Sequence, residues 1–185
     1  EHSSLKEISC GVPQGSMLGP LLFILLINDL PNASLFFKLL YADDTTLTMS
    51  GSDLIKLYHE ANVELEKFSD WFRANKLTLN ISKTKYILFR DKKQIVDFSE
   101  LNLKIDDEKI ERIGESCKDK YFKFVGLYLD EHLTWDYHAK YVRGKAASTV
   151  YALSKLRHLL PKNVKYTVYN SLFRSYIEYG CLCWG

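Results

Sequence analysis

The chain has 185 residues, of which 46% are hydrophobic, 14% aromatic and 26% charged. This composition is that of a globular protein with a sizeable core, and it excludes an intrinsically disordered chain. The formal net charge of +2 neither indicates nor excludes a nucleic-acid-binding protein, so the distribution of charge along the sequence has to decide.

The first recognisable element is a loop rich in glycine and proline, Gly11–Pro20, followed by the apolar run Leu21–Ile27. Glycine and proline oppose regular structure there and let the backbone approach a ligand closely. The apolar run is too short to span a bilayer, and Asn28 and Asp29 follow it. It therefore predicts a buried helix rather than a membrane anchor.

The start of the sequence carries no signal peptide, and its cysteines lack zinc-ribbon spacing. We expect structural or free thiols in a reducing compartment, and hence an intracellular protein of the nucleus or cytoplasm that is neither secreted nor bound to a membrane. Because Glu1 is not an initiator methionine, we also expect the chain to be a piece of a longer protein. The cysteines are Cys10, Cys117, Cys181 and Cys183.

Two adjacent carboxylates lie in the stretch Tyr41–Asp44, between two segments that favour β-strands. The apolar run Leu35–Leu40 precedes them and Thr45–Met49 follows, which predicts a β-hairpin with acids at its tip. Two carboxylates about 4 to 6 Å apart repel by roughly 3 to 4 kcal/mol at an effective dielectric constant near 20. A divalent cation such as Mg²⁺ removes this repulsion. Asp-Asp is also a common structural turn, so both interpretations stay open at this point.

A long amphipathic helix is expected next. Ser50–Asp53 offers turn and N-cap residues, and apolar side chains recur at helical spacing over Leu57–Phe72. A second acidic pair, Asp106-Asp107, is expected to form a solvated hairpin turn, so the dipeptide alone does not identify a metal site. Gly126 lies inside a predicted strand, where glycine indicates a bulge or a close backbone approach. The predicted strands are Tyr86–Phe89, Leu101–Ile105, Ile110–Ile113 and Tyr121–Leu129.

The C-terminal part changes to helical periodicity. Apolar residues three or four apart predict one helix over Thr134–Leu160 and a second over Asn163–Tyr179. No acidic residue lies between Tyr137 and Ile177, whereas basic residues recur. A solvated helical face usually mixes both signs of charge, so a contact surface for a phosphate backbone is as open an explanation as a solvated face. The basic residues assigned to such contacts are Lys140, Arg143, Lys145, Lys155 and Arg157.

In this order, the features resemble the reverse transcriptase domain of non-LTR (LINE-like) retrotransposons over nearly the whole chain. The stretch Leu133–Gly185 is similar to the thumb and to the segment C-terminal to the thumb. The matching blocks are Gly11–Pro20 for motif B, Tyr41–Asp44 for the catalytic motif C, Leu77–Thr84 for motif D and Phe124–Asp130 for motif E, the primer grip.

The resemblance implies RNA-templated DNA synthesis, in which a primer 3′-hydroxyl attacks the α-phosphate of a dNTP with the help of two Mg²⁺ ions. The implied partners are an RNA template, a DNA primer and the dNTP. Asp43 and Asp44 are implied as catalytic and metal-binding carboxylates. Lys83 is implied as a proton donor or charge stabiliser for pyrophosphate, and an ordinary solvated lysine is equally open there.

The same resemblance assigns contacts with the nucleotide, the template and the primer. The basic helices would hold the duplex backbone without reading its sequence. The nucleotide- and template-binding residues are Gln14, Gly15 and Tyr41, and the primer-grip residues are Phe124, Val125, Gly126 and Leu127.

One catalytic carboxylate of the family belongs to motif A, an Asp-x-x-x-x-Phe strand upstream of motif B, and this sequence holds neither that strand nor the fingers. Asp29 is not a convincing substitute because it belongs to the segment that ends the motif B helix. We expect that this chain alone does not polymerise DNA, and that the upstream fingers and motif A segment of the same polyprotein complete the enzyme. Two alternatives stay open: a decayed or co-opted fragment that binds RNA or RNA·DNA without chemistry, and a structural or interaction domain with coincidental acids.

The expected fold class is α+β. A partial polymerase palm would occupy residues 1–130, with an antiparallel sheet backed by the motif B helix and the Leu57–Phe72 helix. A small helical thumb-like region would follow over residues 131–185.

Overall fold

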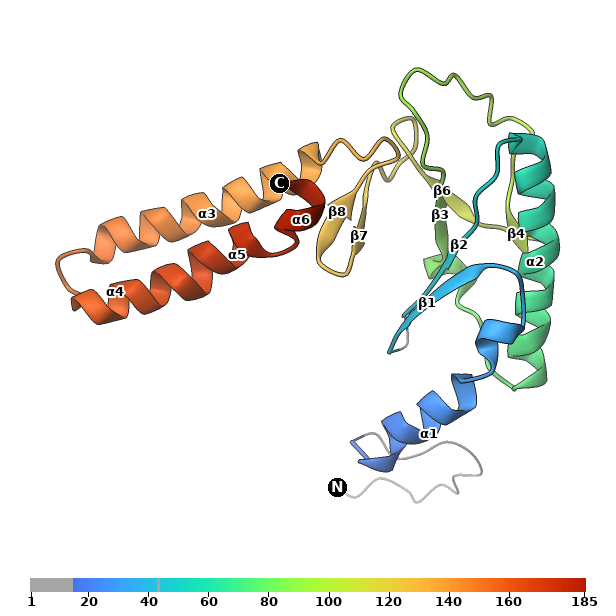
Figure 1. Ribbon diagram of the computed structural model, residues 1–185, viewed down its shortest axis with the longest axis horizontal. Coiled ribbons are helices and arrows are strands. Elements are labelled where there is room, and N and C mark those ends of the chain that lie inside the picture. Colours follow the sequence, from blue (N-terminus) through green and yellow to red (C-terminus); the bar gives the residue numbers. More distant parts are fainter. Residues whose placement is uncertain (1–14, 43) are drawn as a thin grey trace, which may run out of the picture. The chain divides into compact units, whose positions relative to one another are not determined.

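The computed structural model describes residues 15–42 and 44–185 (Figure 1). They form two compact units: the first holds the described residues up to Ile81 together with Phe98–Lys109, and the second holds Ser82–Asp97 and Ile110–Gly185. Both units combine helices with short paired strands, so the predicted α+β class is confirmed. The division into palm and thumb at residue 130 stays a prediction.

The first unit is built around one long helix, α2 (Leu54–Ala74). Its start is fixed by the predicted N-cap, since the Asp53 carboxylate accepts a hydrogen bond from the Lys56 backbone N–H at 3.1 Å. The helix ends at Asn75. The other elements of this unit are α1 (Leu18–Ile27), the 3₁₀ turn η1 (Leu30–Asn32), β1 (Phe37–Tyr41), β2 (Asp44–Thr48), β4 (Lys104–Ile105) and β5 (Glu108–Lys109).

The core of this unit holds the β1–β2 hairpin beside α2. Leu30 is fully buried and packs in one cluster with Ile27 and Phe68. Leu40 of β1 and Leu47 of β2 pack against this cluster. The hairpin that carries the acidic pair therefore rests on buried side chains of η1 and α2.

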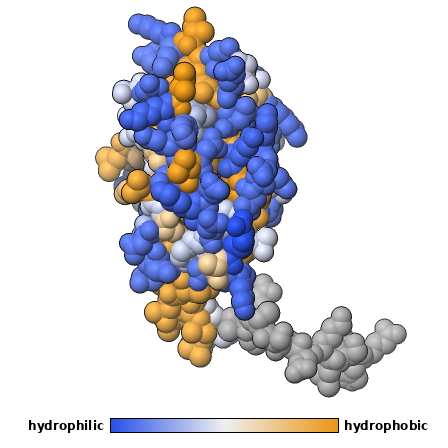
Figure 2. Space-filling view, turned by 90° about the vertical axis from the view of Figure 1, so that its right-hand side faces the viewer, coloured by the Kyte–Doolittle hydropathy of each residue, from blue (hydrophilic) through white to orange (hydrophobic). Residues whose placement is uncertain are grey.

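The helix α1 differs from its prediction. Leu21 is 53% exposed, Leu25 is 65% exposed, and Ile27 is the buried residue of the helix. In Figure 2, hydrophobic side chains gather at the bottom of the view, where α1 lies. The predicted buried helix is thus wrong for this structure, because apolar residues occupy every side of α1 and the described residues cover one side. An exposed apolar patch of this kind is typical of an interaction surface.

The second unit ends in a helical hairpin. The helix α3 (Asp136–Leu156) lies alongside a second helical segment that runs from Lys162 to Glu178 (Figure 1). Both helices were predicted within a few residues of these bounds. The second segment comprises α4 (Lys162–Val168), the π-helical turn η3 (Tyr169–Arg174) and α5 (Ser175–Glu178), and the short α6 (Cys181–Trp184) follows. None of the described helices has the length and apolar character needed to cross a membrane.

The strands form separate pairs rather than one antiparallel sheet. The pairs β1–β2 and β4–β5 are antiparallel, as is the pair of β7 (Phe122–Phe124) and β8 (Leu127–Leu129), whereas β3 (Lys85–Ile87) and β6 (Glu111–Ile113) are parallel. The acidic hairpin turn Asp106-Asp107 joins β4 to β5 as predicted, and both residues have positive φ angles of 50° and 65°. The short turn η2 (Ile81–Lys83) precedes β3.

The segment predicted as one strand over Tyr121–Leu129 is instead a hairpin. It contains β7 (Phe122–Phe124) and β8 (Leu127–Leu129), which pair antiparallel. Val125 and Gly126 form the turn between them, with φ angles of 43° and 87°. Positive φ at both central residues is the geometry of a type I′ turn. The single-strand prediction is wrong because valine is uncommon at such a turn and hides it in the sequence.

Candidate nucleic-acid and metal site

The predicted acidic hairpin is present as β1 and β2. Tyr41 at the end of β1 is paired with Asp44 at the start of β2, and Ala42 adopts a φ of 53° at the tip. Asp43 lies outside the described residues. Tyr41 is 69% exposed, and Asp44 is exposed as well. The hairpin therefore presents a carboxylate and a phenol to solvent next to each other.

The donor chemistry of the hairpin tip fits a hard divalent cation. The Asp44 carboxylate makes no hydrogen bond or ion pair with the residues that the structure describes, so its oxygens are open to an added ligand. Mg²⁺ takes oxygen ligands and commonly uses one or two carboxylates together with substrate phosphates. Asp44 fits this role, and Asp43 would add a second carboxylate.

Of the two nucleotide-binding residues predicted in motif B, Gly15 is described and Gln14 lies outside the described residues. Gly15 has a φ of 90°, and among the described residues no atom lies within 4 Å of the position that a Cβ would take. Backbone conformation therefore favours glycine there, because L side chains rarely adopt this φ. The described part of the chain thus leaves the space beside Gly15 open.

Lys83 and the predicted primer-grip residues belong to the second unit, whereas Asp44 belongs to the first. Lys83 is exposed at the end of η2. Phe124 and Leu127 pair with each other at the ends of β7 and β8, and Val125, at the turn, is 51% exposed. Each unit thus presents its own group of predicted contact residues.

The basic residues of α3 and Arg157 directly after it are exposed, and several lie beside tyrosine rings. Lys140 Nζ is 5.6 Å from the ring centre of Tyr137, and Lys155 Nζ is 5.5 Å from that of Tyr151. Lys145 Nζ is 5.7 Å from the ring centre of Tyr141. In the described part of the chain, no ion pair with an acidic side chain involves Lys140, Arg143, Lys145, Lys155 or Arg157.

The sequence reasoning identified these cations but not their tyrosine partners. The signal was present, because Tyr137 and Lys140 are three residues apart in a predicted helix, as are adjacent side chains on a helix surface. Cations interleaved with aromatic rings are a common feature of nucleic-acid-binding surfaces, where the rings stack on bases or sugars and the cations contact phosphates. The surface has the chemistry of a nucleic-acid contact.

A protein-family model described as reverse transcriptase (RNA-dependent DNA polymerase) matches residues 1–129. The chain belongs to the reverse transcriptase family. The predicted resemblance to the reverse transcriptases of non-LTR retrotransposons is therefore confirmed, since the similar curated proteins are polymerases of such elements. No solved structure matches the chain significantly.

Three relatives illustrate the match. The probable RNA-directed DNA polymerase from transposon X-element of Drosophila melanogaster is 28% identical, over 100% of this chain and 20% of its own length. The RNA-directed DNA polymerase from mobile element jockey of the same species is 24% identical, over 99% of this chain and 20% of its own length. The retrovirus-related Pol polyprotein from type-1 retrotransposable element R1 of Bradysia coprophila is 25% identical, over 97% of this chain and 18% of its own length. The chain thus spans about a fifth of the length of these relatives.

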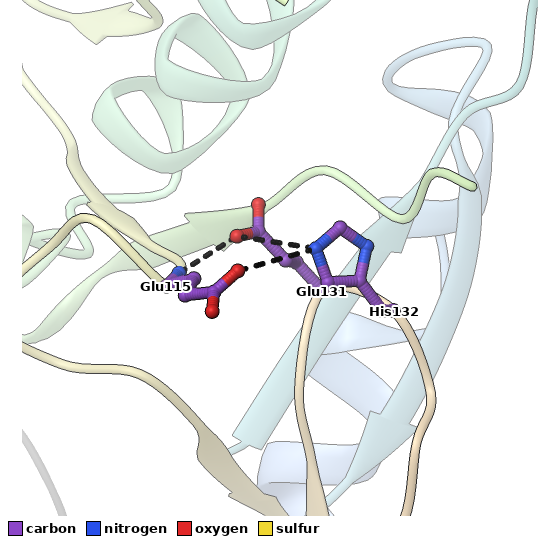
Figure 3. Close-up of side chains that lie close together, drawn as sticks. All are labelled: Glu115, Glu131 and His132. Carbon is purple, nitrogen blue, oxygen red and sulfur yellow. Dashed lines mark hydrogen bonds and ion pairs between the residues drawn. The ribbon is translucent and has the colours of Figure 1, made fainter. Parts of the chain in front are cut away.

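The second unit also contains a cluster of charged side chains around the buried Glu131, which the sequence did not predict. Glu131 is 2% exposed, and its carboxylate lies 3.3 Å from the Arg112 guanidinium and 3.5 Å from that of Arg90. Its other oxygen accepts a hydrogen bond from the Glu115 backbone N–H at 2.7 Å (Figure 3). His132 Nε2 is 3.8 Å from both glutamates.

The ligand atoms of Glu115, Glu131 and His132 lie close enough together to hold a metal ion. Arg90 and Arg112 already neutralise the Glu131 carboxylate, however, and a metal ion would have to displace them or share their charge. We therefore assign this cluster to the stability of the second unit. The assignment of the catalytic metal ligands to the hairpin acids Asp43 and Asp44 stays a prediction.

His138 is a buried titratable group of the helix α3. Its imidazole is 2% exposed, and its Nδ1 faces the Tyr128 backbone N–H at 3.5 Å. The rings of Tyr128, Tyr141 and Trp184 surround it. Burial lowers the pKa of His138 because a charged imidazolium loses its hydration in this aromatic environment.

Acidification is expected to destabilise the second unit through His138. A lowered pKa in the folded state favours neutral imidazole, so its contribution is present above the unfolded value near 6.5 and is lost as pH falls below it. The free energy of unfolding should decrease by up to about 1.4 kcal/mol per pH unit in that range. Urea unfolding at several pH values between 7.5 and 5.5, followed by tryptophan fluorescence, measures this change. A Trp71→Phe background is used because both remaining tryptophans then lie in the second unit.

His138→Phe should remove this part of the pH dependence while keeping an aromatic ring in place. The matched control is His158→Phe, because His158 is exposed in the same unit. An unchanged pH profile in His138→Phe would show that another group is responsible.

Proposed function

We propose that this chain is the catalytic-hairpin and primer-holding part of an RNA-directed DNA polymerase. The observation that carries the proposal is the β1–β2 hairpin, which presents Asp44 opposite Tyr41 in a chain whose residues 1–129 match the reverse transcriptase family. The proposed reaction is nucleotidyl transfer, in which a primer 3′-hydroxyl attacks the α-phosphate of a dNTP and pyrophosphate leaves.

The hairpin acids have the donor chemistry for this reaction. Asp43 is the proposed metal ligand, and Asp44 assists it from the first position of β2. When bound, two Mg²⁺ ions supply charge stabilisation to the attacking and leaving oxygens. Tyr41 supports the turn beside the primer end, and Gly15 offers the open space for the nucleotide. Lys83 is the proposed cation for the departing pyrophosphate.

Two further features support a role for the second unit in holding nucleic acid. Phe124–Leu127 presents a narrow turn for the primer strand. The exposed cations of α3 include Lys140, Arg143 and Lys145, and none of these three has an acidic partner among the described residues. Contacts of this kind hold the phosphate backbone and carry no sequence information.

The absence of a motif A strand from this sequence favours a second function, binding of nucleic acid without polymerisation. The family places a further catalytic carboxylate in an Asp-x-x-x-x-Phe strand upstream of motif B, and no aspartate lies among the first ten residues of this chain. We propose that the isolated 185-residue chain binds RNA·DNA without extending the primer. Upstream fingers and a motif A segment of the same polyprotein would complete the active site.

Binding of a labelled RNA–DNA primer-template to the purified chain tests the proposal. We expect the dissociation constant to rise steeply between 50 and 200 mM salt, because phosphate contacts release counterions. The double substitution Lys140→Gln and Arg143→Gln should weaken binding about equally for unrelated sequences. It should also make the plot of log association constant against log salt concentration less steep, by about one unit of slope for each phosphate that the variant no longer binds. Fluorescence anisotropy measures both quantities.

The matched control is the double substitution Lys92→Gln and Lys93→Gln. These lysines are exposed in the same unit, and the pair removes the same charge. An equal loss of affinity in both variants would show that net charge, rather than the α3 surface, governs binding. Primer extension by the isolated chain in Mg²⁺ would contradict its proposed inactivity.

A further inference from the structure

The turn of the β7–β8 hairpin has a conformation that its first residue disfavours. Val125 adopts a φ of 43°, although a β-branched side chain clashes with the backbone in this left-handed region. Type I′ turns normally place Asn, Asp or Gly at this position. Since such a conformation persists where surrounding structure enforces it, the contacts of the turn should show what holds it.

Tyr179, which follows α5, makes the contacts that hold this turn. Its hydroxyl donates a hydrogen bond to the Val125 carbonyl at 2.5 Å. A Cβ added to Gly126 would lie 3.0 Å from Cε1 of the Tyr179 ring, so the ring lies directly against the turn. A Cβ added to Gly180 would lie 2.7 Å from Leu127 Cδ2, which brings the next residue against the start of β8.

The segment that carries Tyr179 is itself anchored. The Trp184 indole N–H donates a hydrogen bond to the Tyr179 carbonyl at 2.9 Å. The Trp184 ring meets the buried His138 ring edge to face, with 5.0 Å between the ring centres. His138 in turn faces the backbone of Tyr128 in β8. A continuous series of contacts thus runs from the turn through Tyr179 and Trp184 to His138 of α3, and from His138 back to β8 of the hairpin.

We propose that Tyr179–Trp184 is a latch that fixes the β7–β8 turn in its left-handed conformation, with Tyr179 as a positioning residue for the primer strand. The proposal rests on the proposed function where it concerns the primer, since Phe124–Leu127 would contact it. Tyr179 itself acts through the turn and not on the reacting atoms. The fixed turn holds the hairpin ready to bind, so binding spends no free energy on ordering it.

Hydrogen exchange of the 185-residue chain tests the latch without nucleic acid. Tyr179→Phe removes one hydroxyl, and we expect backbone amides of Phe124–Leu127 to exchange about three- to tenfold faster, the effect of removing one hydrogen bond. The matched control is Tyr166→Phe, because Tyr166 is 66% exposed and its ring contacts Tyr169 in the helical segment instead. Equal exchange in the hairpin of wild type and Tyr179→Phe would overturn the latch.

Primer-template affinity then tests the positioning role. Tyr179→Phe should weaken binding about threefold or more. Val125 disfavours the left-handed turn conformation, so without the Tyr179 hydrogen bond a smaller fraction of the chain would hold the turn ready to bind. Val125→Asn gives the turn the Asn-Gly sequence that adopts type I′ geometry by itself. In that background Tyr179→Phe should change affinity less than twofold, and far-ultraviolet circular dichroism checks that each variant is folded.

The outcomes separate the latch from the proposed function. An equal loss of affinity with Val125 and with Asn at position 125 would overturn the positioning role, because the effect would then not depend on the turn. Faster exchange without any change of affinity would overturn it as well. If the wild-type chain bound no primer-template, the proposed function would fail, while the exchange experiment would still decide the latch.

Discussion

Replacing Asp43 by asparagine in the proposed full-length polymerase is expected to lower the rate of primer extension at least a hundredfold, and Asp44→Asn at least tenfold. Asparagine keeps the size and the turn preference of aspartate but removes the negative charge. The proposed hairpin then loses the electrostatic attraction for the cations that stabilise the transferring phosphate. Removal of one such electrostatic group typically costs a factor of a hundred to a thousand in rate.

The same substitutions should leave primer-template affinity within about twofold, since the proposed contacts with the phosphate backbone involve α3 and not the hairpin tip. Asp107→Asn is the matched control: Asp107 is an exposed aspartate of a second Asp-Asp hairpin in the same unit, with a φ of 65°. Primer extension under single-turnover conditions measures the rate, and anisotropy measures binding. Full activity of both Asp43→Asn and Asp44→Asn would contradict the catalytic role, and an equal loss in Asp107→Asn would show a non-specific effect.

Local signals made several elements of this fold predictable. Asp53 is followed by apolar residues at helical spacing, and its carboxylate caps α2 as expected. Asp106-Asp107 forms a hairpin turn as expected, because aspartate tolerates positive φ. The turn is not simply solvated, however. The Asp106 carboxylate accepts hydrogen bonds from Ser69 and Arg73 of α2, each at 2.8 Å, which no local pattern indicates.

Features that depend on distant residues were not predictable. The exposure of α1 depends on what covers its sides, and the apolar run Leu21–Ile27 predicts a buried helix whatever surrounds it. The Val125-Gly126 turn lacks the Asn-Gly signal of a hairpin and is held by Tyr179, 54 residues later in the sequence. Where local preference and structure disagree in this way, a functional or strained site is the usual reason.

The candidate site shows the same division. Asp44, Tyr41 and Gly15 could be named from the sequence because each lies in a short contiguous motif, within the residues that the family model matches, and their roles stay predictions. The tyrosines beside the lysines of α3 lie three or four residues from them in the sequence, so helical spacing alone predicts these contacts. Glu131 and His138 were missed, since a lone acid or histidine gives no sign in the sequence of what will bury it.

Glu131→Ala is expected to destabilise the second unit by about 3 kcal/mol or more. The substitution leaves the guanidinium groups of Arg90 and Arg112 without their shared carboxylate, although their side chains are only 15% and 11% exposed. Breaking a buried ion pair by removing one partner typically costs about 3 to 5 kcal/mol, and the residual exposure of both arginines favours the lower end. The Glu115 N–H also loses its acceptor. Urea unfolding in the Trp71→Phe background measures the loss.

Glu115→Ala is the control that separates a buried ion pair from a metal site. Its carboxylate is 70% exposed, and the substitution keeps the backbone N–H that donates to Glu131, so the free energy of unfolding should change by less than about 0.5 kcal/mol. A metal site would behave differently, because Glu115 and Glu131 would both be ligands and both substitutions would abolish stabilisation by added cations. If Zn²⁺ or Mg²⁺ raised the stability of the wild type and of neither variant, the ion-pair assignment would be wrong. Without such an effect, the ion pairs of Glu131 connect the segment between β8 and α3 to Arg90 and to Arg112 of β6. They would thereby hold the β7–β8 hairpin, with its proposed primer-binding residues, in place.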